Sequence, residues 1–325
     1  MRRCQKKEIR QKGTTDITLL LIVEIYRTWG FSITYLLKVV GIPSSSYYRA
    51  RNPGFIIAGE IHKRKNRGYS FNVFGGTTDD EELEKLLIYI SNADSQLEEI
   101  YYLKFLGSKK LSRYILTYYG IRVNHKKLHR IRKKLNLVGK YKKRDKHPVR
   151  RSTSMKVTEK NQLWEADITF VKTREEPAAI LTVLDVYDRN VVGTYVGNSC
   201  KKENFIELIK LLIENRGRPQ FIRTDNGSQF RASNTGIFMN EEEIAHEFGM
   251  KRNPNSQAYI ESFFSSLKRE FVENNEFLNL DDLCKKLNVY LGFYNNLRHH
   301  GSLNYYSPTD FSEIRSNYAE VLVKL

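Results

Sequence analysis

Three apolar, β-branched runs between residues 162 and 197 limit the fold more than any other feature of the chain. The runs are QLWEADITFV, AAILTVLDVYD and NVVGTYVG, and turn signals at 175–177 and 188–190 separate them. Runs of this composition at hairpin spacing predict three consecutive antiparallel strands.

Helical and strand-like segments alternate after the third run. They are KKENFIELIKLLIEN as an amphipathic helix, QFIRT as a strand, EEEIAHEFG as a helix and MKR as a short strand before a last helix. This order is that of a ribonuclease-H-like α/β fold, in which the first and fourth strands lie side by side. We expect this domain over residues 158–275 and a helical C-terminal extension over 276–325.

The last helix of this domain is predicted over Asn253–Phe271. Asn255 or Ser256 can cap its start, and an apolar stripe follows at i, i+4, i+7 and i+11. Glu261 and Lys268 share a neighbouring face. Taken alone, the pattern also suits an ordinary amphipathic helix with solvated charges.

Two aspartates precede this helix at informative positions. Asp167 lies inside the first strand, and Asp225 lies where the fourth strand opens into the turn DNGS. An aspartate inside a strand is unfavourable unless it has a partner or a metal. With Glu261, these residues can form a carboxylate cluster, and such oxygen ligands favour Mg²⁺ or Mn²⁺.

Other carboxylates compete for this role. Asp185 lies on the second strand and Asp188 in a turn, so we interpret both as structural. Glu165 is two residues from Asp167 and therefore points to the same face of the strand, where it can support the cluster.

The blocks WEADITF, RTDNGSQF and YIESFFSSLKREF resemble the catalytic core of insertion-sequence transposases of the OrfB type, which are relatives of retroviral integrases. That family has 35 residues between its second Asp and its Glu, and Asp225 and Glu261 reproduce the interval. FYNNLRHHGSLNYYSPTDF resembles the closing segment of the family, so the match covers roughly Gln162 to Phe311.

This resemblance implies an integrase core whose catalytic residues are Asp167, Asp225, Glu261 and Lys268. The first three would bind two Mg²⁺ ions, with Mn²⁺ as a substitute, and Lys268 would contact DNA. The resemblance further implies recognition of terminal inverted repeats, action as a homo-oligomer and a separate OrfA-type partner protein.

The net charge of the chain is +17 and is unevenly distributed. Residues 1–151 carry a net +20 and residues 152–325 a net −3. The N-terminal half should therefore attract phosphates, and we expect double-stranded DNA, as transposon ends and target, to be the partner.

Two all-α helix-turn-helix modules are predicted in the basic half, over residues 1–54 and 80–138. In the first, helices are expected over 17–29 and 32–40, the latter ending at Gly41. In the second, the last helix NHKKLHRIRKKL has Asn124 as its cap and suits insertion into a major groove. A solvated basic helix in a bundle is the alternative. The predicted DNA contacts are Lys126, Lys127, Arg130, Lys133 and Lys134.

The start of the second module departs from the family. It reads LGSKKLSRYI where the family is usually rich in glycine and arginine, so DNA contacts from Lys109 and Lys110 stay open. Residues 139–157 are expected to form a basic linker that follows a phosphate backbone, with a solvated tether as the alternative. Its predicted DNA contacts are Lys140, Lys142, Lys143, Arg144, Arg150 and Arg151.

Cys4, Cys200 and Cys284 lack metal-ligand spacing, which indicates a reducing compartment without a zinc site. No apolar run reaches membrane-spanning length, so we expect a bacterial-type cytoplasmic protein without a membrane partner, associated with the nucleoid through DNA.

These features predict a DNA transposase that binds terminal inverted repeats and catalyses two-metal strand cleavage and strand transfer. Two alternatives stay open. One is a metal-dependent nuclease of the same fold that does not join strands. The other is a domesticated DNA-binding regulator with an inert core.

Overall fold

The computed structural model describes residues 32–44, 68–93, 98–139, 156–249 and 257–314, together with Val23, Tyr26 and Tyr47. The chain divides into two compact units, residues 1–67 and 68–325. In the first unit, α2 (Ile33–Val40) ends at Gly41, whose φ of 72° is in the left-handed region that glycine tolerates. The helix predicted over 17–29 lies almost entirely outside the described residues.

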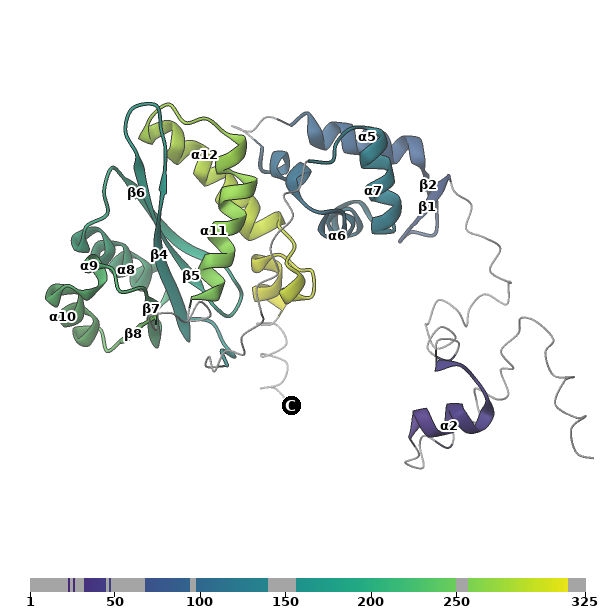
Figure 1. Ribbon diagram of the computed structural model, residues 1–325, viewed down its shortest axis with the longest axis horizontal. Coiled ribbons are helices and arrows are strands. Elements are labelled where there is room, and N and C mark those ends of the chain that lie inside the picture. The colour runs from purple at the N-terminus through teal and green to yellow at the C-terminus, as the bar shows by residue number, and fades with distance from the viewer. Residues whose placement is uncertain are drawn as a thin grey trace, which may run out of the picture. The chain divides into compact units, whose positions relative to one another are not determined.

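The second unit begins with a small sheet and a group of helices (Figure 1). β1 (Tyr69–Asn72) pairs antiparallel with β2 (Thr77–Asp79) and with β3 (Ile121–Arg122). The helical elements are α5 (Asp80–Ser91), the 3-10 helix η1 (Glu99–Phe105), α6 (Ser108–Tyr119) and α7 (His125–Lys134). The Asn124 side chain accepts a 2.8 Å hydrogen bond from the Lys126 N–H, so the predicted cap is confirmed.

A five-stranded sheet follows, in the order β6-β5-β4-β7-β8. β4 (Leu163–Val171), β5 (Ala178–Asp185) and β6 (Val191–Gly197) are antiparallel neighbours, as the three apolar runs predicted. β7 (Phe221–Thr224) is parallel to β4 and to β8 (Ala245–Phe248). The first and fourth strands are therefore adjacent, as the ribonuclease-H-like order requires.

Helices cover both faces of this sheet (Figure 1). α8 (Lys202–Arg216), α9 (Ser228–Arg231) and α10 (Ser233–Glu241) pack on the face that presents Trp164 and Leu181. α11 (Ala258–Glu270) and α12 (Leu280–Gly292) pack on the face that presents Ile180 and Leu184. The period-2 alternation along β5 assigns its side chains to these two cores. Short helical turns follow as η2 (Val272–Asn274), the π-helical η3 (Phe293–Leu297) and η4 (Gly301–Leu303).

The helix predicted over 241–249 is wrong. α10 ends at Glu241, Glu243 has a φ of 54°, and β8 then pairs in register with β7, with Ala245 opposite Phe221. The local run of glutamates favours a helix, but the sheet edge offers backbone hydrogen bonds that outweigh this propensity. The short strand expected at residues 250–252 and the cap at Asn255 or Ser256 lie outside the described residues.

The helices of residues 80–138 share one hydrophobic core with α11 and α12. Leu83, Tyr102 and Ile115 belong to the same buried cluster as Phe271 and Tyr290. The rings of Tyr102 and Tyr290 meet edge to face, with centroids 5.1 Å apart. These two parts are therefore packed against each other within the second unit. Among the described helices, none combines the length and the apolar character needed to cross a bilayer.

Candidate active site

The strand register places Asp167 and Asp225 next to each other. In the parallel pair of β4 and β7, Ala166 lies opposite Thr224, and the two aspartates are the next residues on each strand. β7 ends at Thr224, so Asp225 lies directly beyond the C-terminal end of this strand and is exposed, and Asp167 is half-buried. The predicted convergence of the two aspartates is thus supplied by backbone pairing alone.

Glu261 reaches the same region from the first turn of α11, the helix that packs on β4 and β5. The Oε2 atom of Glu165 on β4 accepts hydrogen bonds from the backbone N–H groups of Tyr259 (3.1 Å) and Ile260 (2.8 Å). A buried carboxylate on the strand therefore fixes the helix start directly before Glu261. The i, i+2 spacing placed Glu165 on the same face of the strand as Asp167, but it did not predict this contact with the helix.

A buried arginine completes the support of Glu165. Arg223 on β7 lies 3.6 Å from the Glu165 carboxylate, and its Nη2 donates to Glu247 on β8 at 2.7 Å. Burial raises the pKa of Glu165 to about 7, while the bonds from the helix and the charge of Arg223 act in the opposite direction. No spacing in the sequence indicated that Arg223 has this role.

The three candidate catalytic carboxylates act on one another electrostatically. Burial, together with the negative charges of Asp225 and Glu261, raises the pKa of Asp167 to about 6, against a lowering by the hydrogen bond from the Ile168 N–H. Burial also raises the pKa of Glu261. Among the described residues, no lysine or arginine forms an ion pair with any of the three. Within the described part of the chain, this negative charge therefore has no basic partner.

This arrangement fits hard divalent cations by donor type and charge. The hydroxyl of Thr182, the cross-strand neighbour of Asp167 on β5, is buried and has no hydrogen-bond partner in the described part of the chain. Within the same part, no three His, Cys, Asp or Glu side chains are grouped tightly enough to enclose an ion. The three carboxylates are thus near neighbours in an open arrangement, with Asp225 and Glu261 exposed to solvent.

The two competing aspartates have backbone partners. Asp185 accepts hydrogen bonds from the N–H groups of Asn161 and Tyr187, both at 2.8 Å. Asp188 accepts one from the N–H of Asn190 at 2.9 Å. Their carboxylates hold the turns around β5, which agrees with the structural interpretation.

Comparison with known proteins agrees with this geometry. Residues 157–254 and 242–308 match two family models, each described as an integrase core domain, and residues 80–145 match an HTH-like domain. The chain carries an integrase core and is related to insertion-sequence transposases. The resemblance seen in the sequence is thereby confirmed, and so is the expectation of an enzyme of this class.

Two relatives illustrate the relationship. The transposase for insertion sequence element IS904 of Lactococcus lactis is 28% identical over 215 residues, which are 61% of this chain and 83% of the relative. An uncharacterized 31 kDa protein of insertion element IS600 from Shigella sonnei is 28% identical over 244 residues, 71% of this chain and 88% of the relative.

Solved structures of integrases are also similar to the chain. The catalytic core domain of BIV integrase is 20% identical, covers 50% of this chain and 99% of its own, and has a TM-score of 0.39. The HTLV-2 integrase catalytic core domain in complex with magnesium is 19% identical, with coverages of 47% and 96% and a TM-score of 0.39.

The HTH-like domain divides its predicted DNA contacts into two stripes along α7. Lys127 forms an ion pair with Asp80, and Lys134 forms one with Glu84 at 2.7 Å, so both are engaged by the acidic start of α5. The other stripe, at i, i+4 and i+7, is exposed and consists of Lys126, Arg130 and Lys133. The predicted contacts of the linker, residues 140–151, lie outside the described residues.

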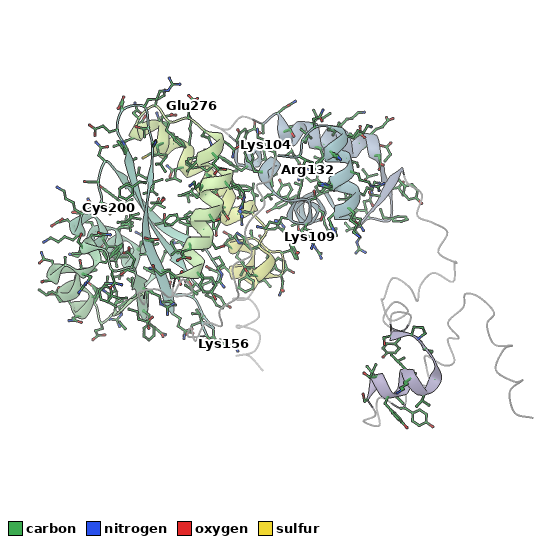
Figure 2. The ribbon with its side chains drawn as sticks, viewed as in Figure 1. Lys104, Lys109, Arg132, Lys156, Cys200 and Glu276 are labelled. Atoms are coloured by element: carbon green, nitrogen blue, oxygen red, sulfur yellow. The ribbon has the colours of Figure 1, made fainter. Side chains whose placement is uncertain are left out.

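One basic residue of α7 is buried. The guanidinium of Arg132 donates to the carbonyl oxygens of Lys104 (2.7 Å) and Leu106 (2.8 Å), which end η1. Figure 2 shows Arg132 and Lys104 on neighbouring elements of the HTH-like domain. Arg132 thus ties α7 to the segment that leads into α6.

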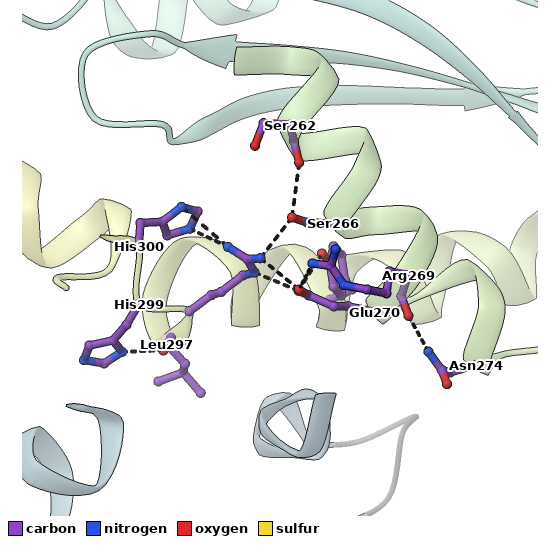
Figure 3. Close-up of polar contacts among 10 residues, drawn as sticks. Ser262, Ser266, Arg269, Glu270, Asn274, Leu297, His299 and His300 are labelled. Carbon is purple, nitrogen blue, oxygen red and sulfur yellow. Dashed lines mark hydrogen bonds and ion pairs between the residues drawn. The ribbon is translucent and has the colours of Figure 1, made fainter. Parts of the chain in front are cut away.

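A buried ion pair joins α11 of the integrase core to the C-terminal segment. Arg298 donates to both carboxylate oxygens of Glu270, at 2.7 and 2.8 Å, and to the Ser266 hydroxyl at 2.9 Å. Burial alone would raise the pKa of Glu270, but the charge of Arg298 outweighs it and holds that pKa below its usual value. His300 lies beside the same guanidinium (Figure 3). This pair, 28 residues apart, was not predicted from the sequence.

Lys268 lies on α11, two turns beyond Glu261, and is exposed. A rise of 1.5 Å per residue places the two positions roughly 10 Å apart along the helix axis.

Proposed function

We propose that the chain is a DNA transposase that binds the terminal inverted repeats of an insertion sequence and catalyses strand cleavage and strand transfer. One observation carries this proposal: Asp167 on β4 and Asp225 directly after β7 follow the register pair of Ala166 and Thr224, and the charges of Asp225 and Glu261 both raise the pKa of Asp167. Phosphoryl transfer needs such a site, where uncompensated carboxylates meet an exposed edge.

The carboxylates of Asp167, Asp225 and Glu261 would hold two Mg²⁺ ions, for which Mn²⁺ substitutes. When bound, such ions activate an oxygen nucleophile and stabilise the leaving oxygen of an in-line displacement. The role of the protein is to keep the ligands in place, through strand pairing for the aspartates and through Glu165 for the helix of Glu261. Lys268 would hold a phosphate of the same DNA strand.

The DNA contacts of the HTH-like domain are proposed to come from the exposed stripe of α7. Lys126, Arg130 and Lys133 suit the major groove, because their ammonium and guanidinium groups face solvent. We further propose that the linker over 139–157 follows the phosphate backbone. From the resemblance we also propose a homo-oligomer, an OrfA-type partner protein, and action in the cytoplasm on nucleoid DNA.

The test uses labelled duplexes that end in the DNA flanking the gene, with Mg²⁺, Mn²⁺ or no metal. Wild type is compared with Glu261→Gln, which keeps the shape and removes a metal-binding charge. The control is Glu273→Gln, at an exposed glutamate beyond the same helix. We expect metal-dependent nicking and joined products from wild type and the control. In Glu261→Gln both should fall by more than about 10³-fold, the equivalent of several kcal/mol.

The three possible activities give different products. Nicks without joined strands would identify a nuclease. DNA binding without cleavage, even with an OrfA-like partner added, would contradict the proposal and favour a regulator.

A further inference from the structure

A cavity of about 600 Å³ opens between the HTH-like domain and the end of α11. We call it the junction cavity. α6 and α7 both begin at its wall, at Ser108 and His125, so the positive ends of two helix dipoles face it. Six of its lining residues carry the argument: Lys109, Lys110, His125, Lys126, His129 and Arg269.

Positive charge in the junction cavity is not balanced. Its acidic lining residue, Glu270, is already bound by Arg298 and by Arg269, the latter at 2.7 Å. Among the described residues, no carboxylate lies within ion-pair distance of Lys109, Lys110 or Lys126. This is the opposite of Lys127 and Lys134 on the same domain, which have acidic partners.

Lys110 is the most affected of these amines. Burial, followed by the nearby charge of Arg298, lowers its pKa to about 7. An anion in the cavity would favour the charged form of the Lys110 amine and would therefore act against this lowering of its pKa. The backbone at the start of α6 also favours an anion. Gly107 precedes the helix and supplies no side-chain cap, so a ligand oxygen can approach the first N–H groups.

These features fit a phosphate. Several amines, the start of α6 without a side-chain cap and room for a group of this size together form an environment that phosphodiesters occupy in proteins. Free inorganic phosphate and a DNA phosphodiester have the same chemistry, so either could supply the group bound in the cavity. The position of the cavity relative to the carboxylates favours DNA. Arg269 is eight residues beyond Glu261 on α11, about 12 Å along its axis. One DNA strand advances about 3.4 Å per step along the duplex axis, so a duplex that runs parallel to α11 would cover this distance in three or four steps.

We propose that the junction cavity binds a backbone phosphodiester of the DNA strand that is cut at Asp167, Asp225 and Glu261. The HTH-like domain and the integrase core would then hold the same strand, through Lys109 and Lys110 on one side and Arg269 on the other. This inference rests on the proposed function, because it concerns the DNA of that active site.

The test measures DNA binding by the full chain without divalent metal, so that cleavage plays no part. Lys109→Gln and Lys110→Gln are compared with wild type and with Lys85→Gln, a matched control at an exposed lysine on α5 outside the cavity. We expect three- to tenfold weaker binding for each cavity variant. The slope of log K against log salt should fall by about 0.9 for each lost phosphate contact. Lys85→Gln should bind as wild type does.

A second arm locates the phosphate. Methylphosphonates, which are uncharged, replace one phosphate at a time along the cut strand. Wild type should lose affinity at a position three or four steps from the cut bond, and the cavity variants should not lose more there. Cavity variants that bind like wild type, or a loss equal to that of Lys85→Gln, would overturn the inference.

Inorganic phosphate distinguishes the two sources. If phosphate raises the melting temperature of wild type but the cavity variants bind DNA normally, the site takes free phosphate and the DNA assignment is wrong. Failure of the proposed function would look different. In that case wild type does not cut with metal, while the binding and methylphosphonate results still decide whether the cavity holds DNA.

Discussion

The carboxylate of Glu165 accepts a 2.8 Å hydrogen bond from the backbone N–H of Ile260. The next residue is Glu261, so a strand of the sheet sets the position of the helix that carries the third candidate ligand. Asp167 and Glu261 are therefore coupled through the backbone and through Glu165, in addition to their charges.

Replacing Glu165 by alanine should lower both stability and activity. The variant leaves the N–H groups of Tyr259 and Ile260 without their acceptor and removes a partner of Arg223, at a cost of about 2–4 kcal/mol. Glu165→Gln keeps an acceptor oxygen, so it should retain more strand cleavage than Glu165→Ala. Cleavage rate and Mg²⁺ dependence, measured beside the melting temperature, check this. Equal loss in both variants at equal stability would show that the hydrogen bonds do not position Glu261.

The Glu270–Arg298 pair should show strong coupling in a double-mutant cycle. Glu270→Gln or Arg298→Met alone leaves a buried charge without its partner and should cost about 3–5 kcal/mol in the free energy of unfolding. The double variant should cost less than the sum, because neither charge remains. Urea unfolding of the four proteins gives the coupling energy. An additive result would mean that the ion pair contributes little to joining α11 and the C-terminal segment.

Neighbouring lysines of α7 should differ in their effect on DNA binding. Lys133→Ala removes an exposed cation and should reduce the salt slope by about 0.9 and weaken binding. Lys134→Ala removes an amine that already pairs with Glu84, so it should change binding much less. Fluorescence anisotropy over a salt series compares the two. If Lys134→Ala is the more damaging variant, DNA approaches the other stripe of the helix.

Binding at the junction cavity should weaken as pH rises above about 7. The pKa of Lys110 is lowered to about 7 in the free protein, and a bound phosphate raises it, so DNA binding takes up a proton in this range. The charged and titratable groups around Lys110 are Lys109, His125, Lys126, His129, Arg269, Glu270, Arg298, His299, His300 and Tyr305.

The contribution of Lys110 is isolated by Lys110→Arg, whose guanidinium stays charged throughout. Wild type should lose affinity between pH 7 and pH 9 with a log–log slope of up to 1, and Lys110→Arg should lose less over the same range. The histidines are present in both proteins, so the difference between the two profiles belongs to Lys110. Identical profiles would exclude protonation of this amine on binding.

The sequence predicted the parts of this fold that depend on local pattern. Alternation in residues 162–197 gave three strands, Asn124 gave a helix cap, and the interval between Asp225 and Glu261 gave the candidate ligands. β8 was missed because its pairing with β7 is a tertiary effect that its own glutamates oppose.

The remaining features depend on contacts between distant segments. Arg298 meets Glu270 only because the C-terminal segment folds back on α11, and no periodicity encodes that approach. Likewise, the acidic partners of Lys127 and Lys134 lie on α5, some fifty positions earlier, so the basic helix appeared uniform in the sequence. The junction cavity exists only between two packed domains.

The edge-to-face contact of Tyr102 and Tyr290 helps to fix the distance between two parts of the second unit. The HTH-like domain and the integrase core share one hydrophobic core. The distance between α7 and the carboxylates is therefore set by this packing. Under the proposed function, a transposon end that is bound by α7 and cut at the carboxylates would be measured in base pairs. Inserting a single pair between the two points would turn the target phosphate by about 35° around the duplex, given about 10 base pairs per turn. The position of the proposed cut would then be set by this packing.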